Sequence, residues 1–432
     1  MTDDATTLPA GASTIEARLR KAGLPPLPRL AWLEVDLTAI ASNTRVLGSA
    51  LAPDTGLGAV VKADGYGHGL LAAAHAALSG GAAMLCVATL DEAIELRRAG
   101  FETPILIMFA IPPGSVREAL AAGFELAAMD AASVEALARG LAELPAGSSE
   151  PRVHLGIDTG MTRGGLLPTE AVAAARRLLD AGLGGIAGTW SHLASPEDPD
   201  ATARQVEAFR STLDDLARTG IEPGLRHLNS TGGMFDDAAP DWDLVRVGLA
   251  LYGHLPTDIR IAPGRAPAAA ALRPALRLKA RPVSIEDVPA GTAVGYGGTW
   301  RAERTSRIAI LPVGYADGWT RLYADQATAR VRGVDVPLVG RVSMDAIAAD
   351  LTDVPGVSQA DEVTVLAPPG EGGSTVEELA RIRGTISWEV LAAFSPRLSR
   401  VYTEGGSVVG VRHLDGRLAL APGFALRGAR TT

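Results

Sequence analysis

Lys62 is the residue whose setting fits covalent chemistry best. It follows the apolar segment GLGAVV and precedes the loop ADGYGHG. A lysine that ends a buried strand loses hydration, which disfavours its charged form and lowers its pKa. The neutral amine that results can form a Schiff base with an aldehyde. The alternative interpretation is a lysine whose stem covers apolar surface while its ammonium reaches solvent.

Two further segments have the composition of anion-binding backbone. The glycines of DGYGHG can expose N–H groups at a helix start, where a phosphate binds well. Asn229 and Ser230 precede the segment TGG in a similar way, although a serine there could equally cap a helix. Both segments therefore predict a site for an anionic ligand.

Other polar side chains lie within apolar segments. Arg246 in LVRVGLALYG needs an acceptor, which a ligand or a structural carboxylate would provide. His192 in TWSHLA could serve a ligand or bond within the core. No histidine pair has the spacing of a zinc motif, and Cys86 is the single cysteine, so no metal site is predicted.

The elements that would position these residues alternate between short apolar runs and helical stretches. The runs lie at 60–63, 85–89, 105–110, 126–130, 153–158, 186–193, 226–230 and 244–248. Continuous apolar strands separated by helices indicate a parallel sheet. Eight such units over about 220 residues favour a closed (β/α)8 barrel, whose active site lies at the carboxyl ends of its strands.

The remainder of the chain has a different pattern of apolar and turn-forming residues. After a Pro/Ala-rich segment, short β-like runs separated by Gly and Pro predict a C-terminal, mainly antiparallel β domain. We therefore expect an N-terminal extension over 1–30 with one short helix (14–21), a barrel over 31–265 and a β domain over 266–432. In that last part, Ser374 and Glu377 form a capping-box pattern that predicts the start of a helix.

Composition excludes several classes of protein. Hydrophobic residues make up 47% of the chain and charged residues 21%, so wholesale disorder is excluded. The net charge of -9 argues against a nucleic-acid-binding protein. One cysteine excludes an internal disulfide framework, and we find neither a secretory signal nor an apolar run of the ~20 residues that cross a bilayer. We therefore expect a cytoplasmic protein without a membrane or nucleic-acid partner.

Taken together, the motifs resemble the alanine racemase family of fold-type III enzymes that use pyridoxal 5'-phosphate (PLP). They are VVKADGYGHG, GIDTGMTRGG, TWSHLA, HLNSTGG, RVGLALYG, VGYGGTW, VGYADG, GRVSMD and PRLSRVY. The resemblance runs from about Ala31 to Tyr402. It implies a PLP-binding barrel followed by a β domain, and a racemase that supplies D-alanine for cell-wall synthesis.

The resemblance also implies a two-base mechanism. Lys62 would bind PLP as an imine and act as one base, and Tyr296 would be the other. In the family that tyrosine reaches the PLP of the other subunit, so a homodimer with shared active sites is implied. Tyrosine has a reference pKa of about 10, so a nearby positive charge must assist it. Arg163 and Arg246 could supply that charge.

The remaining site positions follow from the same motifs. Around the cofactor would lie Tyr66, Asn229, Ser230, Gly248 and Leu249 at the phosphate, Arg246 at the pyridine nitrogen and His192 against the ring. The substrate would meet Arg163, the backbone N–H of Met344 and, near the entrance, Tyr315. Since arginine cannot give up its proton, it would leave the pyridine nitrogen unprotonated, which favours return of the proton to Cα over transamination.

Three positions depart from the family pattern. Gly156 stands where many relatives have a lysine, which in several of them is carbamylated and braces the arginine that corresponds to Arg163. Trp388 stands where relatives usually have tyrosine, and Gly65 where they often have alanine. The first two suggest a racemase for serine or for a broader set of amino acids as an alternative.

Two other classes remain as alternatives. A fold-type III decarboxylase shares the barrel, but it usually has an acidic residue at the pyridine nitrogen and a cysteine near the partner's site. Arg246 and the lone Cys86 argue against it. A single-barrel PLP carrier protein needs no second base, so Tyr296 and the β domain argue against that class.

Overall fold

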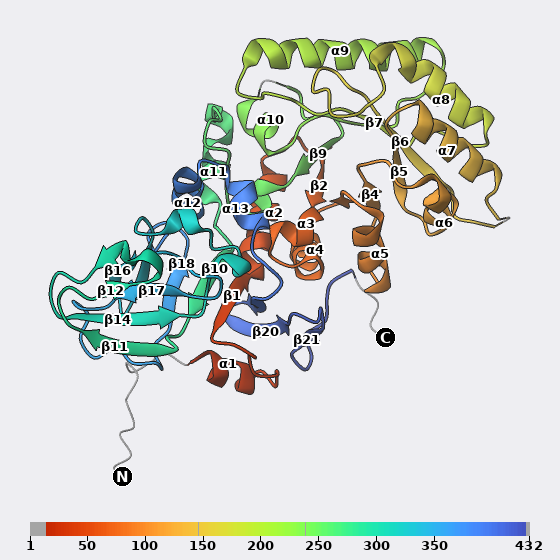
Figure 1. Cartoon of the computed structure of the whole chain (residues 1–432). Coiled ribbons are helices and arrows are strands. Elements are labelled where there is room, and N and C mark those ends of the chain that lie inside the picture. The colour runs from red at the N-terminus through yellow and green to blue at the C-terminus, as the bar shows by residue number, and fades with distance from the viewer. Residues whose placement is uncertain (1–13, 146, 238, 429–432) are drawn as a thin grey trace. The chain divides into compact units, whose positions relative to one another are not determined.

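The structure, a computed structural model, describes residues 14–145, 147–237 and 239–428 (Figure 1). The chain divides into two compact units. The first, here called the sheet unit, comprises the described residues up to Ala39, Gly67–Gly69 and Arg273–Ala425. The second, the barrel unit, comprises Ile40–Tyr66, Leu70–Leu272 and the described residues from Leu426.

The barrel unit contains the predicted parallel strands. They are β2 (Gly56–Val60), β3 (Met84–Val87), β4 (Ile105–Ile107), β5 (Glu125–Ala128), β6 (Arg152–Gly156), β7 (Gly188–Trp190), β8 (Leu225–His227) and β9 (Leu244–Val247). They pair in the order β8-β7-β6-β5-β4-β3-β2-β9, and all pairs are parallel. Two backbone hydrogen bonds, from Asp243 to Arg226 and from Arg246 to Asn229, connect the end strands. The barrel prediction is confirmed.

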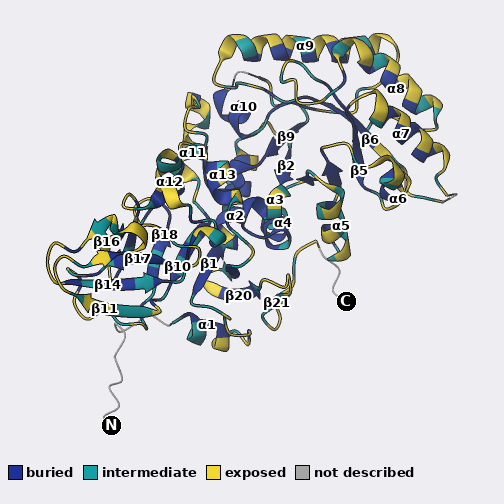
Figure 2. Cartoon of the chain, in the orientation of Figure 1, coloured by how far each residue is buried: buried dark blue, intermediate teal, exposed yellow. Residues whose placement is uncertain are grey.

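Helices flank these strands, and the strands themselves are almost wholly buried (Figure 2). The longer ones are α2 (Leu37–Ser49), α4 (Leu70–Ser79), α5 (Leu90–Arg98), α7 (Ala131–Ala142), α8 (Ala171–Asp180) and α9 (Pro199–Arg218), and the shorter ones α3 (Lys62–Tyr66), α6 (Val116–Ala121), α10 (Thr231–Asp236) and α11 (Ala266–Ala271). The 3-10 turn η3 (Leu249–Tyr252) follows β9 directly. The Pro/Ala-rich segment forms α11.

The sheet unit is built on one large sheet. Its strands are β1 (Ala31–Asp36), β10 (Leu276–Ala280), β11 (Ser284–Val288), β14 (Ser306–Leu311), β15 (Thr328–Val331), β16 (Val334–Val339), β17 (Ile347–Asp350), β18 (Val363–Leu366), β19 (Ser399–Glu404), β20 (Ser407–Arg412) and β21 (Leu418–Leu420). All neighbours are antiparallel except β1 and β19. A small hairpin, β12 (Ala293–Val294) with β13 (Trp300–Arg301), stands apart. The predicted antiparallel domain is thus confirmed.

The boundary between the units differs from the sequence prediction at residue 31. Strand β1 was expected to begin the barrel, but it pairs with β10 and β19 of the large sheet. The predicted short helix is present as α1 (Ile15–Lys21), which Thr14 caps. Its apolar face packs Ile15 and Leu19 against Trp32 and Val401. Residues 1–13 lie outside the described part of the chain.

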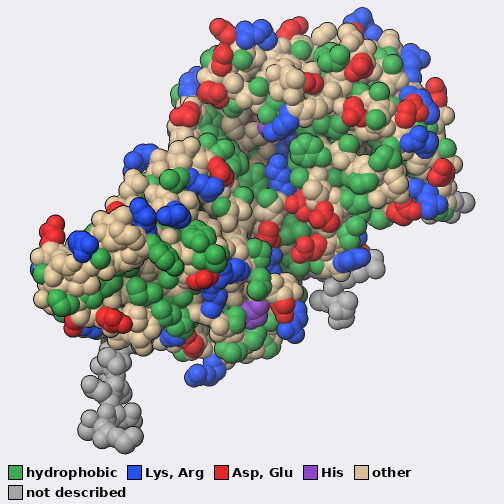
Figure 3. Space-filling view, viewed as in Figure 1, with side chains coloured by type: hydrophobic (Ala, Val, Ile, Leu, Met, Phe, Trp, Pro, Cys, Tyr) green, Lys and Arg blue, Asp and Glu red, His purple; other side chains and the backbone are tan. Residues whose placement is uncertain are grey.

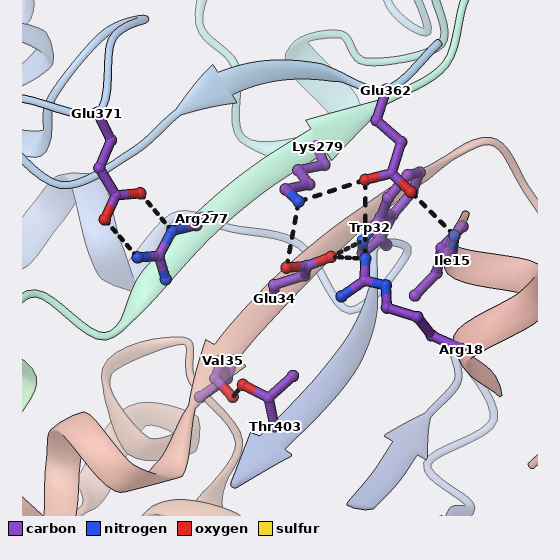
Figure 4. Close-up of polar contacts among 10 residues, drawn as sticks. All are labelled: Ile15, Arg18, Trp32, Glu34, Val35, Arg277, Lys279, Glu362, Glu371 and Thr403. Atoms are coloured by element: carbon purple, nitrogen blue, oxygen red, sulfur yellow. Dashed lines mark hydrogen bonds and ion pairs between the residues drawn. The ribbon is translucent and has the colours of Figure 1, made fainter. Parts of the chain in front are cut away.

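A buried charge cluster also connects α1 to this sheet (Figure 4). Glu34 accepts from Arg18 and from the indole of Trp32, and Lys279 lies 3.4 Å from it. Lys279 is also 3.3 Å from Glu362. Burial alone would raise the pKa of Glu34, but the charge of Lys279 and the hydrogen bond from Arg18 outweigh it and hold that pKa below its usual value. The cluster therefore stabilises the ionised carboxylate.

One capping prediction is wrong by a residue. Helix α12 (Val376–Arg383) has Thr375 as its N-cap, and Glu378 completes the capping box. The hydroxyl of Ser374 is already used, since it bonds both the N–H and the carbonyl of Thr328 on β15. The second helix of this region is α13 (Ser387–Ala392). Among the described residues, no helix is long and apolar enough to cross a membrane.

Candidate active site

Lys62 lies directly beyond β2, at the carboxyl end of the parallel strands, where its chemistry was expected. Figure 3 shows basic and histidine side chains together in a hollow near β2 and β9. The side chain of Lys62 is partly buried, and burial lowers the pKa of its amine. The charges of Arg163 and Arg246 lower it further, and they outweigh the opposite effect of Glu92. The surroundings thus favour a neutral, nucleophilic amine.

The turn that begins at Lys62 is left-handed, which the sequence did not reveal. The φ angles of Ala63, Asp64, Gly65 and Tyr66 are 53°, 55°, 61° and 53°. Such a conformation costs roughly 1–2 kcal/mol per non-glycine residue. The right-handed helix that follows the glycines, α4, begins at Leu70.

Local hydrogen bonds hold this strained turn. The carboxylate of Glu92 accepts from the N–H of Ala63 at 2.7 Å, and Asp64 accepts from the N–H of Leu70 at 2.9 Å. Gly65 fits closely here, because a Cβ at this position would lie 2.8 Å from the Cβ of Ala73 and would have to displace it. Strain of this kind is typical of functional sites, where surrounding contacts fix one conformation.

Arg246 on β9 is the most completely buried cation of the barrel unit's site. Its Nη1 donates to Nδ1 of His227 at 2.7 Å, and its Nη2 donates to the carbonyl of Ser191 at 2.6 Å. Its guanidinium carbon also lies 4.8 Å from the ring centre of Trp190. No described residue accepts a hydrogen bond from Nε. Burial lowers the pKa of Arg246 to about 10, so the group remains charged at neutral pH.

A cradle for an anion lies among the residues predicted to surround a phosphate. A Cβ on Gly248 would lie 2.5 Å from the hydroxyl of Tyr66, so only glycine leaves this space open. Burial raises the pKa of Tyr66 to about 12, which keeps its hydroxyl protonated and able to donate. Ser230 is the N-cap residue of α10, but its side chain makes no capping bond, so the first N–H groups of the helix remain available. Leu249 is buried beside them.

Asn229 and His192 have different surroundings. The amide nitrogen of Asn229 donates to the carbonyl of Pro240 at 3.0 Å, whereas its Oδ1 is buried with no partner among the described residues. Nδ1 of His192 lies 3.5 Å from Nη2 of Arg246. Burial and the nearby charge of Arg246 lower the pKa of His192 to about 3, so this ring is neutral. A neutral ring can lie against an aromatic ligand without adding a charge.

Met129 and Trp190 pack against Gly156, the position where many relatives have a lysine. A Cβ on Gly156 would lie 2.4 Å from Sδ of Met129 and 3.3 Å from the indole of Trp190. Arg163, which that lysine would brace in relatives, is exposed, and no described residue accepts a hydrogen bond from it. The barrel unit therefore leaves Arg163 unbraced.

The other predicted residues lie in the sheet unit and share one exposed face. Tyr296, at the start of the 3-10 turn η5 (Tyr296–Gly298), is 69% exposed, and Met344 is 52% exposed. Tyr315 begins η6 (Tyr315–Asp317), and its N–H donates to the carbonyl of Ser343 at 3.0 Å. A Cβ on Gly297, beside Tyr296, would lie 3.1 Å from the guanidinium of Arg341. The loops that carry Tyr296, Tyr315 and Met344 are thus neighbours.

Several residues of the barrel site escaped the sequence analysis. Tyr252 stacks on Tyr66 with ring centres 5.0 Å apart. His227, His154 and Glu125 continue from Arg246, at the end of β8, in the middle of β6 and at the start of β5 respectively. A polar residue inside an otherwise apolar strand is the signal that could have found them. No group of acidic, histidine or cysteine side chains in the described part of the chain could hold a metal ion.

Family models match most of the chain. Residues 35–256 match the alanine racemase N-terminal domain, and residues 275–402 match the alanine racemase C-terminal domain. Alanine racemase of Desulfovibrio desulfuricans is 36% identical over 380 residues, which cover 87% of this chain and 99% of the relative. That of Salinispora tropica is 38% identical over 381 residues, covering 86% and 98% respectively.

Solved structures agree with these matches. Alanine racemase from Bacillus anthracis with bound L-Ala-P superposes with a TM-score of 0.80 at 31% identity, covering 90% of this chain and 99% of that one. Alanine racemase from Bartonella henselae with covalently bound pyridoxal phosphate gives a TM-score of 0.74 at 27% identity, covering 87% and 100%. Both similarities extend over the barrel and the sheet unit.

Proposed function

The chain belongs to the alanine racemase family, which makes it an isomerase that interconverts L-alanine and D-alanine, and we propose that Lys62 and Tyr296 move the α-proton. The observation that carries this proposal is the setting of Lys62. Its amine has a lowered pKa, and it stands at the carboxyl ends of the barrel strands with Arg246 and Arg163 nearby. A neutral amine in such a place can bond covalently to an aldehyde and accept a proton.

We propose PLP, the cofactor of the family, as the ligand of the barrel site. Lys62 would be its covalent attachment, and Arg246 would donate from its free Nε to the ring nitrogen. The cradle of Tyr66, Gly248 and the uncapped start of α10 would hold the phosphate. When bound, PLP withdraws electrons from Cα of the amino acid and so acidifies the α-proton.

The protein side of the reaction needs one base on each face of Cα. Lys62 would accept or deliver the proton on one face, and the phenol of Tyr296 would do so on the other. Arg163 and the backbone N–H of Met344, which bonds no described residue, would bind the carboxylate of the amino acid. Tyr315 would border the entrance. Arg246 keeps its proton near neutrality, so the ring nitrogen stays unprotonated and return of the proton to Cα is favoured.

A homodimer follows from the role proposed for Tyr296. Its side chain is 69% exposed and bonds no described residue, as expected of a group that completes a neighbouring site. We propose that Tyr296 of the partner subunit faces Lys62 of this chain, and that Met344 contributes in the same way. The buried state of the lone Cys86 fits the reducing cytoplasm, where we place the enzyme.

A second candidate is a racemase that also accepts serine or other small amino acids. The observation that favours it is Arg163, which has neither a lysine nor a described carboxylate to brace it. A carboxylate-binding arginine without a brace leaves the substrate's position less strictly fixed. Exchange of the α-hydrogen in deuterated water, measured for a panel of amino acids, decides between the two. Exchange with alanine alone contradicts this second candidate.

The test of the proposed function uses the small number of lysines in the chain. Only Lys21, Lys62 and Lys279 are present, so borohydride reduction of the PLP-loaded protein followed by peptide mass spectrometry assigns the attachment site. We expect the label on Lys62, and loss of both label and racemase activity in Lys62→Ala. Lys21→Ala, in exposed Lys21, is the matched control and should retain both. Label on another lysine, or an active Lys62→Ala variant, would contradict the proposal.

A further inference from the structure

A continuous chain of buried side chains runs inward from Arg246 through the barrel. Nη1 of Arg246 lies 2.7 Å from Nδ1 of His227, and Nε2 of His227 lies 3.0 Å from Nδ1 of His154. Nε2 of His154 lies 2.6 Å from Oε2 of Glu125, whose Oε1 accepts from Arg152 at 2.6 Å. Both histidines are fully buried, and Glu125 is 1% exposed.

The chemistry of the end groups fixes where every hydrogen of this chain lies. A guanidinium can only donate, so Nδ1 of His227 must accept and its Nε2 must carry the hydrogen. Nδ1 of His154 therefore accepts, and its Nε2 donates to Glu125. The carboxylate of Glu125 accepts from both sides. All donors from Arg246 to His154 thus point toward Glu125, and both rings are neutral.

The charges around the rings support this arrangement. Burial lowers the pKa of His227 well below its usual value, and the charge of Arg246 adds to the effect. Burial would raise the pKa of Glu125, but the hydrogen bond from His154 and the charge of Arg152 outweigh it and keep the group ionised. Glu125 is consequently the acceptor that the whole chain needs.

A glycine on the neighbouring strand leaves room for the ring of His154. In the pairing of β6 with β7, His154 stands opposite Gly188. A Cβ on Gly188 would lie 2.4 Å from Nδ1 of His154, so any larger residue would displace the ring. The ring of His154 meets that of His227 edge to face, with centres 5.2 Å apart. The positions of both rings are therefore fixed by packing as well as by hydrogen bonds.

We propose that Glu125 and His154 are positioning residues for Arg246: they fix the proton order of the two histidines, and so present His227 to the guanidinium as an acceptor. With the opposite order, Nδ1–H of His227 would point a hydrogen at the guanidinium and push it from its place. The consequence for catalysis rests on the proposed function, in which Nε of Arg246 serves the ring nitrogen of PLP. The proton order itself does not depend on that function.

Glu125→Gln keeps the shape of the side chain but removes its charge and one of its two acceptor oxygens. A glutamine has one oxygen, so it cannot accept from both His154 and Arg152 as the carboxylate does. We expect kcat for alanine to fall about tenfold, as for other outer-shell residues, with KM within about twofold. Glu135→Gln is the matched control, because Glu135 also binds an arginine, Arg177, but is exposed on α7. That control should keep the kcat of the unaltered enzyme.

The decisive readout is the position of the hydrogens in the PLP-loaded, unaltered protein, by neutron diffraction or by 15N NMR of labelled histidines. We expect hydrogen on Nε2 and none on Nδ1 of both His154 and His227, and a fraction of His227 with hydrogen on Nδ1 in Glu125→Gln. Hydrogen on Nδ1 of His227 in the unaltered protein, or an unchanged kcat in Glu125→Gln, would overturn the proposal. If the unaltered enzyme lacks racemase activity, the proposed function fails, whereas the hydrogen positions still decide the proton order.

Discussion

The two residues proposed to move the α-proton have contrasting surroundings. Lys62 is partly buried on a left-handed turn, with Glu92 bonded to the next residue and arginines nearby. Tyr296 is 69% exposed and bonds no described residue. One chain therefore holds the first base firmly in place, while the second base extends toward solvent.

This contrast shows that the barrel unit and the exposed face hold their side chains in place by different means. In the barrel unit, strain, burial and a chain of hydrogen bonds fix Lys62 and Arg246 before a ligand arrives. On the exposed face that bears Tyr296, Tyr315 and Met344, only the loops are in place, and in the proposed dimer a partner surface fixes the tyrosine side chain. Substitutions in the barrel unit should therefore lower both stability and activity, whereas substitutions on the exposed face should lower activity alone.

The largest effect on stability is expected for Arg246→Leu, which removes the central donor of the hydrogen-bonded chain in the barrel unit. It leaves Nδ1 of His227 and the carbonyl of Ser191 without their donor. Each buried acceptor that is left without a donor costs about 1–3 kcal/mol of unfolding free energy. Urea unfolding measures this loss. The control Arg177→Leu, which breaks an exposed pair with Glu135, should cost less than about 1 kcal/mol. Equal losses in the two variants would show that burial of Arg246 does not matter.

Tyr296→Phe tests whether the exposed Tyr296 acts as the second base. Removal of one acid–base group should lower kcat by roughly 10²–10⁴-fold. Because the hydroxyl bonds no described residue, the unfolding free energy should change by less than about 0.5 kcal/mol. Racemase assays in both directions and thermal unfolding measure the two quantities. Activity close to that of the unaltered enzyme would mean that another group acts as the second base.

Gly156→Ala tests how tightly Met129 packs against position 156. The new Cβ would meet Sδ of Met129 at 2.4 Å, and overpacking of this kind costs about 1–3 kcal/mol. Gly185→Ala is a matched control, since a Cβ there meets nothing within 4 Å. Calorimetric unfolding of both variants measures the difference. If the two variants are equally stable, Met129 does not fill this space tightly.

The smallest effect is expected at Glu34, in the cluster that fixes α1 to the sheet bearing the exposed face. Its folded-state pKa lies below the ordinary value of 4.5, so its stabilisation is fully present above that pH and is lost as the pH falls through the folded-state pKa. Glu34→Gln should therefore cost about 1.5 kcal/mol at pH 7, and this difference should disappear in strong acid. Unfolding curves from pH 7 to pH 3 measure it. A difference that grows in acid would contradict the assigned ionisation.

Much of this arrangement could be predicted from the sequence. The apolar runs identified the strands β2 to β9, because fully buried parallel strands are apolar throughout. Lys62, His192, Asn229 and Arg246 were found as polar residues within or directly after apolar runs, and the carboxyl ends of such runs meet at one side of a barrel. Their mutual contacts bear out that expectation for His192 and Arg246.

What the sequence could not reveal depends on long-range pairing. Strand β1 reads as the start of the barrel, but its register with β10 and β19, 240 or more residues away, decides its place. Glu125, His154 and His227 become one chain only through the registers of β5 to β8. The left-handed turn at Lys62 depends on Glu92 of another helix, and the true cap of α12 on the prior use of Ser374 by β15.

Mixing of two inactive variants tests the central claim most directly. Lys62→Ala and Tyr296→Phe protomers, dissociated and reassociated together, should regain activity, because each mixed dimer has one site with Lys62 of one protomer and Tyr296 of the partner subunit. Random association gives mixed dimers in about half of the molecules, so about a quarter of the activity of the unaltered enzyme is expected. A mixture that remains as inactive as its parents would contradict the shared site, since both groups would then have to come from a single chain.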